Sequence, residues 1–367
     1  MAEPLKNRYK RAFFDSLLQD FEASAYSIDS KSFFDRLFSP EWEAMELKER
    51  LRHITQVLHQ VLDKPFAEAI EIMKPVAARQ QPSFEHMFFP DYVELYGLEE
   101  DWDTAMDALE HFTQYSSSEF AIRPFITRDA ERTMSQMVAW VQHESHHVRR
   151  LATEGCRPRL PWAMALPDFK RDPSPVLPIL ETLKNDPSEY VRRSVANNLN
   201  DIAKDHPEVV LEIAQRWLGQ TAETDWIVKH ACRTLLKQGN PSALRLFGFG
   251  DPALVSVSDL RTRLPQVAIG DDLDFSFSLN HQAPSDLRLR IEYGIYYLKS
   301  NGKQNRKVFM ISENTYAPQE NHHFARKQSF RNMTTRKHYP GPHRLSIIVN
   351  GEEQAEIPFE VSIKAMP

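Results

Sequence analysis

The chain has 367 residues, of which 41% are hydrophobic and 26% charged, so it is long enough for two packed domains of ordinary size. Its two cysteines lie far apart and it contains no run of about 18 apolar residues, which excludes a disulfide scaffold, a cysteine-ligated zinc site and a membrane helix. The first residues lack the apolar core of a signal peptide, and we expect a cytoplasmic protein that does not bind membranes.

Charge is unevenly distributed along the chain, although the net charge is only −6. Residues 1–150 contain 17 Lys and Arg against 26 Asp and Glu, whereas residues 151–367 contain 28 against 25. Between Lys299 and Lys337, nine basic residues stand against two acidic ones. Positive charge suited to a nucleic-acid partner is therefore concentrated late in the chain.

Up to about residue 250 the sequence pattern is helical. Apolar residues recur at intervals of three and four, and prolines and clusters of Asp, Ser or Asn separate the segments. One amphipathic helix is predicted from Ala139 to Thr153. No convincing strand-like alternation occurs in this part, so the first domain is predicted to be all-α.

This helical part contains internal repeats. Val148, Val191 and Val228 share one column of three segments that align without gaps: HESHHVRRLATEGCRP (143–158), DPSEYVRRSVANNLND (186–201) and ETDWIVKHACRTLLKQ (223–238). Their spacings of 43 and 37 residues are close to those of HEAT-type repeats, and SSSEFAIRPFIT (116–127) is a looser fourth member. Each repeat is expected to form a helical hairpin that stacks on its neighbours into a solenoid.

Each repeat helix is predicted to carry a polar column opposite its apolar stripe. On a helical wheel these columns contain, repeat by repeat, Arg150, Glu154 and Arg157, then Arg193, Asn197 and Asn200 with Asp201 on the flank, and finally His230, Thr234 and Lys237. In a solenoid such columns lie side by side and form one surface. The alternative is a merely solvated face, and Asp186 and Arg192 are more typical of a structural ladder between repeats.

Arginine and tryptophan are concentrated where the first repeat helix must end. Pro158 disfavours helix at Arg157, so the chain is expected to leave as a loop that carries Arg159 and Trp162. Arginine pairs bidentately with phosphate oxygens, which favours a nucleic-acid backbone as the partner. The alternative is that Trp162 covers the hydrophobic core and the arginines are solvated.

Acidic residues on the same surface need a separate explanation, because they repel phosphates. Glu154 shares a face with the arginines, Asp201 lies in the next repeat, and Glu119 stands at the helix start of the preceding one. Carboxylates in such a place are suited to a substrate that carries or develops positive charge. The alternative is that each is an ordinary ion-paired surface residue.

Beyond about residue 255 the pattern changes to strands. Apolar and polar residues alternate at period two, and Asn-Gly dipeptides are typical of hairpin turns. These features occur at 271–281, 287–298 and 343–363, with the dipeptides at Asn301-Gly302 and Asn350-Gly351. A compact antiparallel sandwich is predicted.

SSSEFAIRPF, VRRLATEGCRPRLPWA and VRRSVANNLNDIAKDHPE, in this order and followed by strands, resemble the AlkC-type DNA glycosylases. The related AlkD-type branch has the repeats without the sandwich, so the second half of this chain favours AlkC. The resemblance covers essentially the whole chain. It implies a multidomain α-then-β fold, with a HEAT-like α-helical solenoid over residues 1–253 and an immunoglobulin-like β-sandwich that contacts DNA over residues 254–367.

The resemblance also implies a reaction, hydrolysis of the N-glycosidic bond of cationic methylated bases in double-stranded DNA, mainly N3-methyladenine and N3-methylcytosine, as a step of base excision repair. The damaged base need not swing into a deep pocket. A cationic base leaves readily as a neutral molecule, so the enzyme has to stabilise the oxocarbenium-like sugar and position a water molecule. No cofactor and no metal are expected, since HESHH (143–147) lacks the carboxylate context of a zinc site. The protein is expected to be a monomer.

Individual roles follow for the residues already singled out. Glu119, Glu154 and Asp201 are expected to stabilise the cation and position water, and Trp162 to contact the lesion nucleotide through its ring face. Contacts to DNA are expected from Arg150, Arg157, Arg159, Arg193, Asn197, His230, Lys303, Arg306 and Lys307. A second hypothesis is a HEAT-repeat scaffold that binds DNA or protein without chemistry, and the carboxylates around Trp162 discriminate against it.

Overall fold

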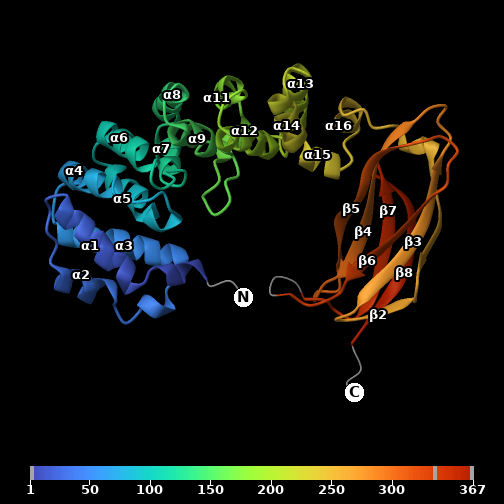
Figure 1. Ribbon diagram of the computed structural model, residues 1–367, viewed down its shortest axis with the longest axis horizontal. Coiled ribbons are helices and arrows are strands. Elements are labelled where there is room, and N and C mark those ends of the chain that lie inside the picture. The colour runs from blue at the N-terminus through green and yellow to red at the C-terminus, as the bar shows by residue number, and fades with distance from the viewer. Residues whose placement is uncertain (1–3, 334–336, 364–367) are drawn as a thin grey trace. The chain divides into compact units, whose positions relative to one another are not determined.

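The computed structural model describes residues 4–333 and 337–363, which divide into two compact units (Figure 1). The helical unit comprises Met1–His206 and Trp217–Ala231, and the strand unit comprises Pro207–Arg216 and Cys232–Pro367. No helix among the described residues is long and apolar enough to cross a membrane.

The helical unit consists of α-helices and short 3-10 helices. Its α-helices are α1 (Arg11–Ala23), α2 (Ser30–Leu37), α3 (Leu47–Leu62), α4 (Phe66–Ala77), α5 (Phe88–Gly97), α6 (Trp102–Phe112), α7 (Ile122–Arg128), α8 (Ala130–Trp140), α9 (His146–Glu154), α10 (Pro167–Arg171), α11 (Leu177–Leu183), α12 (Glu189–Ile202) and α14 (Ala222–Ala231). The 3-10 helices are η1 (Leu5–Arg8), η2 (Trp42–Ala44) and η3 (Phe84–Met87).

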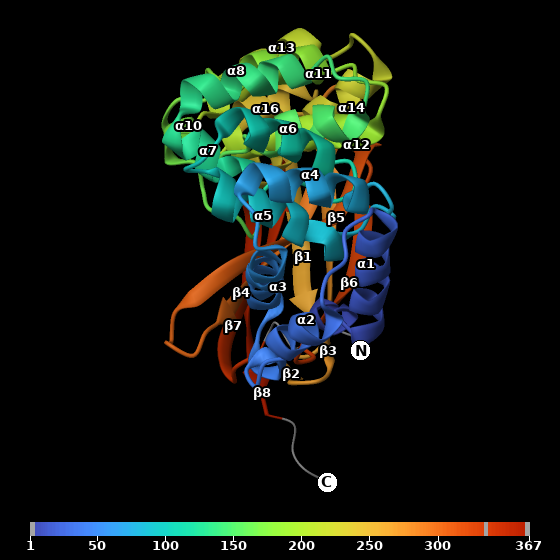
Figure 2. The same cartoon turned by 90° about the vertical axis from the view of Figure 1, so that its left-hand side faces the viewer.

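The repeats stack in two layers, as a HEAT-like solenoid does. Figure 1 shows α8 and α11 in one layer and α9, α12 and α14 in the other, and Figure 2 again shows α8 and α11 above α12 and α14. Helix α12 packs against α9 on one side and α14 on the other. The aligned valines at 148, 191 and 228 are all buried, which confirms that the shared column of the three repeats is the apolar side of each helix.

The predicted helix from Ala139 to Thr153 is wrong, because the chain turns between Trp140, where α8 ends, and His146, where α9 begins. Hydrogen bonds fix this turn: the Ser145 amide donates to His143 Nδ1 at 2.9 Å, and the Arg149 guanidinium donates to the carbonyl oxygens of His143 and Glu144 at 2.9 and 2.8 Å. The turn separates the two helices of one repeat. The amphipathic pattern continued through it because both helices contribute to the same core.

A structural ladder between repeats is present, but its pairing differs from the simplest expectation. Arg149 of one repeat pairs with Asp186 of the next, with Nε 2.6 Å from Oδ2. Arg192 instead donates to the backbone carbonyls of Asp186 and Pro187 at 2.7 and 3.0 Å. These contacts join α9 to the turn before α12 and set the spacing of the two repeats.

The strand unit contains eight described strands. They are β1 (Val255–Thr262), β2 (Gln266–Ala268), β3 (Asp272–His281), β4 (Leu287–Leu298), β5 (Gln304–Tyr316), β6 (His322–Ser329), β7 (Gly341–Val349) and β8 (Glu352–Ser362). The helices of this unit are α13 (Pro207–Trp217, whose last residue belongs to the helical unit), α15 (Arg233–Lys237), α16 (Pro241–Leu246) and η4 (Pro252–Leu254).

Two sheets form the immunoglobulin-like sandwich. One has the order β1-β3-β6 and the other β2-β8-β7-β4-β5. Inward-facing apolar residues of both sheets form one core, among them Phe275, Phe277, Ile291, Ile295 and Leu345. The strands predicted at 271–281 and 287–298 and the terminal hairpin are confirmed. The pairing is antiparallel, as predicted, except at one edge, where the short strand β2 pairs with β8 in parallel.

The Asn350-Gly351 turn also joins the sandwich to its helices. Both residues have positive φ, 46° and 84°, as a type I′ turn requires. A Cβ at Gly351 would lie 2.1 Å from the Cα of Gly239, which connects α15 to α16, so only glycine fits there. Helices α15 and α16 therefore pack with the strands. The change from helix to strand at Val255 is close to the predicted boundary at 253/254, which stays a prediction.

Candidate active site

Trp162 lies in the loop between α9 and α10, residues 155–166, the light-green segment that projects from the row of helices in Figure 1. Backbone hydrogen bonds close this loop, from the Leu166 amide to the Pro158 carbonyl at 3.1 Å and from the Ala163 amide to the Leu160 carbonyl at 3.3 Å. Trp162 has a φ of +65°, a left-handed backbone that is rare for a bulky residue, and its side chain is 62% exposed. It does not cover the core, so that alternative is wrong.

Arg157, at the start of this loop, is enclosed by carboxylates rather than exposed. Its Nη1 lies 2.6 Å from Glu154 Oε1, and its Nη2 lies 2.8 Å from Asp201 Oδ2 on α12. All three side chains are buried. Burial opposes the charge of Arg157, but the two carboxylates outweigh it and raise the pKa of the guanidinium. Arg157 thus joins the carboxylates of two repeats.

Arg150, seven residues earlier and on α9, makes a second bridge of the same kind. Its Nη1 binds Glu119 Oε2, and its Nη2 lies 3.4 Å from Glu154 Oε1. The Ser117 hydroxyl donates to the same Glu119 oxygen at 2.8 Å. The Tyr190 ring lies 4.8 Å from the guanidinium carbon of Arg150 and covers it.

Together these residues form a row of alternating charges, hereafter the charge row: Glu119, Arg150, Glu154, Arg157 and Asp201. Three carboxylates and two guanidiniums leave a net charge of −1 in the row. Outside the row, Lys204 pairs with Asp201 at 2.9 Å. The structure links the three carboxylates through arginines, so the ion pairing that was the alternative for each of them is present, and their catalytic role stays a prediction.

An open cavity of about 490 Å³ lies over the charge row and is lined by Glu119, Arg150, Glu154, Arg157 and Trp162. Asp201, the third carboxylate of the charge row, does not line this cavity. Phe84, Phe120, His147 and Tyr190 add aromatic surface. Burial lowers the pKa of His147, helped by His146 and Arg150, so this imidazole is neutral near pH 7 and adds no positive charge. The cavity thus offers carboxylates, aromatic faces and paired arginines to one ligand.

Several residues of this site were missed in the sequence. Phe84, whose ring meets that of Trp162 edge-on at 6.5 Å, comes from η3, far from the repeats in sequence. Lys48, from α3, donates to the Trp162 carbonyl oxygen. No spacing in the sequence links these positions to the loop. Phe120 follows Glu119, and Tyr190 lies three residues before Arg193 in the sequence. Their closeness to predicted site residues was the one signal that could have identified these two aromatic residues.

The expected DNA contacts of the helical unit have partners within the protein. Arg159 forms a bidentate pair with Asp205 at 2.7 to 3.1 Å and is partly exposed. Arg193 is exposed and pairs with Glu189 at 2.6 Å. His230 lies 3.0 Å from the Asn197 side-chain oxygen, and its ring stacks on exposed Trp226 at 5.0 Å.

The basic residues of the strand unit lie both in turns and within strands. Lys303 lies in the turn after β4, but Arg306 and Lys307 belong to β5, and Arg306 pairs with Glu353 at 2.8 Å. Arg326 and Lys327 belong to β6 rather than to a loop, because β6 extends to Ser329 beside β3. The part of the basic segment at 334–336 lies outside the described residues.

Within the described ranges, no group of three or more His, Cys, Asp or Glu side chains is arranged to hold a metal ion. His146 and His147 lie side by side, with ring centroids 4.1 Å apart, and both rings contact Tyr190. These histidines thus belong to the aromatic surroundings of Arg150.

Sequence comparisons match both parts of the chain. The family described as "Uncharacterised protein YhaZ, C-terminal Ig-like domain" matches residues 256–363, and the HEAT repeat family matches residues 176–206. The chain is 45% identical to a Bacillus subtilis (strain 168) protein named "Uncharacterized protein YhaZ" over 360 residues, which are 97% of this chain and 99% of that one.

A solved structure matches across both parts. The alkylpurine DNA glycosylase AlkC of Pseudomonas fluorescens, bound to DNA that contains an abasic-site analogue, is 38% identical and covers 98% of this chain and 100% of its own, with a TM-score of 0.93. The helical repeats, the sandwich and the order of the two are therefore shared along the full length. The chain belongs to the AlkC family of HEAT-repeat proteins with a C-terminal immunoglobulin-like domain.

Proposed function

We propose that this protein is a DNA glycosylase that hydrolyses the N-glycosidic bond of cationic alkylated bases in double-stranded DNA, with N3-methyladenine and N3-methylcytosine as substrates. The three carboxylates of the charge row, two of which line the cavity, are the observation that carries the proposal. The name of the solved relative, an alkylpurine DNA glycosylase, supports it.

This reaction depends more on stabilising the positive charge of the sugar than on a general acid that protonates the leaving base. A base methylated at N3 is already cationic and leaves as a neutral molecule, so its departure needs no proton from the protein. The deoxyribose then carries positive charge at C1′ until water adds. Fixed carboxylates near the developing oxocarbenium ion lower the barrier, as they do in glycoside hydrolysis.

Glu119 is the carboxylate that we assign to the attacking water. Both oxygens of Glu154 are engaged, Oε1 by the two arginines and Oε2 by Ser194 at 2.5 Å. Both oxygens of Asp201 are engaged by Arg157 and Lys204. Glu119 Oε1 makes no hydrogen bond to any other described residue, and Glu119 lines the cavity. It can accept a proton from water while Glu154 and Asp201 act through their charge.

Trp162 would present its ring face to the lesion nucleotide, because a cationic base or sugar is attracted to the π-face of an indole. Arg159, Arg193, Lys303 and Lys307 are exposed or partly exposed and would contact phosphates, as would Asn197 and His230 of the helical unit. A scaffold that only binds DNA gains nothing from three carboxylates under the cavity, since they repel phosphates. The enzyme hypothesis therefore explains more of the site than the scaffold hypothesis.

The decisive experiment is release of N3-methyladenine from methylated DNA by the purified protein. In single-turnover assays we expect Glu119→Gln to lower the excision rate by about 10²–10³-fold, the usual size of one lost electrostatic contact in a transition state. DNA binding by this variant should be equal to or tighter than that of the wild type, because a negative charge is removed.

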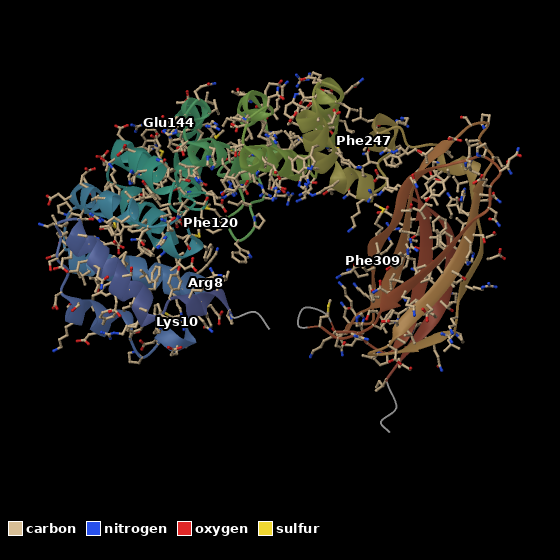
Figure 3. All side chains as sticks on the ribbon, viewed as in Figure 1. Arg8, Lys10, Phe120, Glu144, Phe247 and Phe309 are labelled. Carbon is tan, nitrogen blue, oxygen red and sulfur yellow. The ribbon has the colours of Figure 1, made fainter. Side chains whose placement is uncertain are left out.

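Glu144→Gln is a matched control, since Glu144 is exposed and Figure 3 shows it and Phe120 on opposite edges of the row of helices. Excision by the wild type together with full activity of Glu119→Gln would reject the role of Glu119. Absence of excision by the wild type from any methylated DNA would reject the proposed function and favour the scaffold.

A further inference from the structure

A buried arginine without a carboxylate partner lies behind the Trp162 loop. Arg123, on α7, is 0% exposed, and the described residues provide no acidic side chain within ion-pair distance of it. Burial lowers its pKa to about 10, so the guanidinium is still charged near pH 7. A buried cation is costly unless polar groups compensate it, and here backbone carbonyl groups bind Nε and Nη1, while Nη2 has no partner among the described residues.

The carbonyl groups bound by Arg123 lie at both ends of the loop. Its Nη1 donates to the carbonyl oxygens of Gly155 and Arg157, each at 2.8 Å, where α9 has just ended. Its Nε donates to the carbonyl oxygen of Met164 at 2.7 Å, on the returning side of the loop. One rigid guanidinium therefore fixes the distance between the two ends of the segment that contains Trp162.

A second cation binds the tip of the same loop from outside. Lys48, an exposed residue of α3, donates to the carbonyl oxygen of Trp162, and its Nζ lies 5.2 Å from the centre of the Phe120 ring. Trp162 is the loop residue with left-handed backbone, a conformation that persists only where its surroundings hold it. Lys48 thus contacts the loop at the residue whose backbone is strained.

We propose that Lys48 and Arg123 are positioning residues for the reaction, which hold the Trp162 loop in one conformation through its backbone carbonyls. Arg123 sets the separation of the loop ends, and Lys48 sets the peptide plane beside Trp162 and with it the direction of the indole. The first helices of the chain, which carry none of the charge row, thereby contribute to the site through Lys48. This inference rests on the proposed function, since Trp162 is taken to contact the lesion.

Lys48→Met is the main test, because Lys48 is exposed and methionine keeps an apolar stem against Phe120. We expect the excision rate at saturating protein to fall by about tenfold to a hundredfold, as displaced catalytic groups cause elsewhere. Lys48→Arg, which retains a donor and a charge, should recover most of the loss. Lys64→Met removes a lysine from the same group of helices without touching the loop and should behave as the wild type.

Hydrogen exchange supplies a readout that does not need catalysis. The amides of Ala163 and Leu166, which close the loop, should exchange faster in Lys48→Met than in the wild type and at nearly wild-type rates in Lys48→Arg. Arg123→Lys keeps the buried charge but cannot span the three carbonyls, so the same amides should exchange faster still. Unchanged exchange in both Lys48→Met and Arg123→Lys overturns the inference, whether or not the protein excises bases.

A double-mutant cycle links Lys48 to Trp162. If Lys48 acts through Trp162, then Lys48→Met should cause no further loss of excision rate in a Trp162→Ala background. Two independent, additive losses would overturn the positioning role. A fall of about one unit in the salt slope of DNA binding would also overturn it, because it would make Lys48 a phosphate contact. If the wild type lacks activity, the proposed function fails while the exchange measurements still decide the role of the two cations.

Discussion

Arg157 and Arg159 are two residues apart, yet their surroundings give them different roles. Arg157 is buried between Glu154 and Asp201, whereas Arg159 is partly exposed and pairs with Asp205 at the surface. The sequence suggested that both contact phosphates. We now infer that Arg157 holds the carboxylates of the charge row in place and that Arg159 alone of the two reaches the DNA backbone.

The salt dependence of binding separates these roles. We expect Arg159→Met to lower the slope of log K against log salt by about one unit, because one phosphate contact is lost. Arg157→Met should leave the slope unchanged and instead slow excision, since Glu154 and Asp201 lose their shared cation. Binding isotherms at several salt concentrations and single-turnover rates measure both effects. A lower salt slope in Arg157→Met would show that Arg157 contacts a DNA phosphate after all.

Asp91, on α5, makes the free energy of unfolding of the protein depend on pH. Burial raises its pKa from 3.8 to about 6, although Arg52 lies 2.9 Å from one oxygen, and its other oxygen has no partner among the described residues. The folded state therefore binds this proton more tightly than the unfolded state. The resulting stability is present below about pH 4 and is lost as the pH rises through 6, by up to about 3 kcal/mol.

Asp91→Asn should remove this dependence. We expect the free energy of unfolding of the wild type, relative to the variant, to decrease between pH 4 and pH 6 and to be constant above about pH 7. Urea unfolding across this range measures the difference. A constant difference between the two proteins over the whole range would show that Asp91 titrates at its ordinary pKa.

At the scale of the elements, the Arg149–Asp186 pair carries the contact between α9 and the turn before α12. Asp186 is buried, so removal of Arg149 leaves an uncompensated carboxylate. We expect Arg149→Met to lower the free energy of unfolding by about 3 kcal/mol, near the lower end of the range for broken buried pairs. Arg193→Met, which removes an exposed pair with Glu189, should cost less than about 1 kcal/mol. Equal effects in chemical denaturation would contradict the ladder.

The sequence predicted those elements whose signal is local. Repeats were visible because Val148, Val191 and Val228 must be buried in every repeat, and β3, β4 and the β7–β8 hairpin because alternation and Asn-Gly turns are short-range features. The turn between α8 and α9 was missed, since both helices present apolar residues to one core.

Contacts between residues that are far apart in sequence were the second feature that could not be predicted from the sequence. Glu119, Glu154 and Asp201 were predicted to come together because each stands at a related position of a repeat. Lys48, which meets Trp162 over a separation of 114 residues, has no such relation. Whether an arginine is buried or exposed also depends on the partner across the next repeat, as Arg157 shows.

At the scale of the whole molecule, the two halves of the chain differ in charge. Residues 1–150 are strongly acidic, and the segment from Lys299 to Lys337 is strongly basic. A protein that binds DNA with an acidic first half needs cations elsewhere to offset the repulsion of phosphates. The exposed lysines at the β4–β5 hairpin, Lys303 and Lys307, have no ion pair among the described residues, whereas Arg306 is paired with Glu353.

Neutralising these lysines tests whether the strand unit contributes to DNA binding. We expect Lys303→Gln with Lys307→Gln to lower the salt slope of binding by about two units, because two phosphate contacts are lost. Lys31→Gln with Lys64→Gln removes the same charge from the helical unit and should leave the slope unchanged, since these lysines are far in sequence from the repeats. Excision at saturating protein should stay near the wild-type rate in both pairs, because neither touches the charge row. Equal slopes for the two pairs would show that the basic hairpin is solvated and that the strand unit serves stability or a protein partner instead.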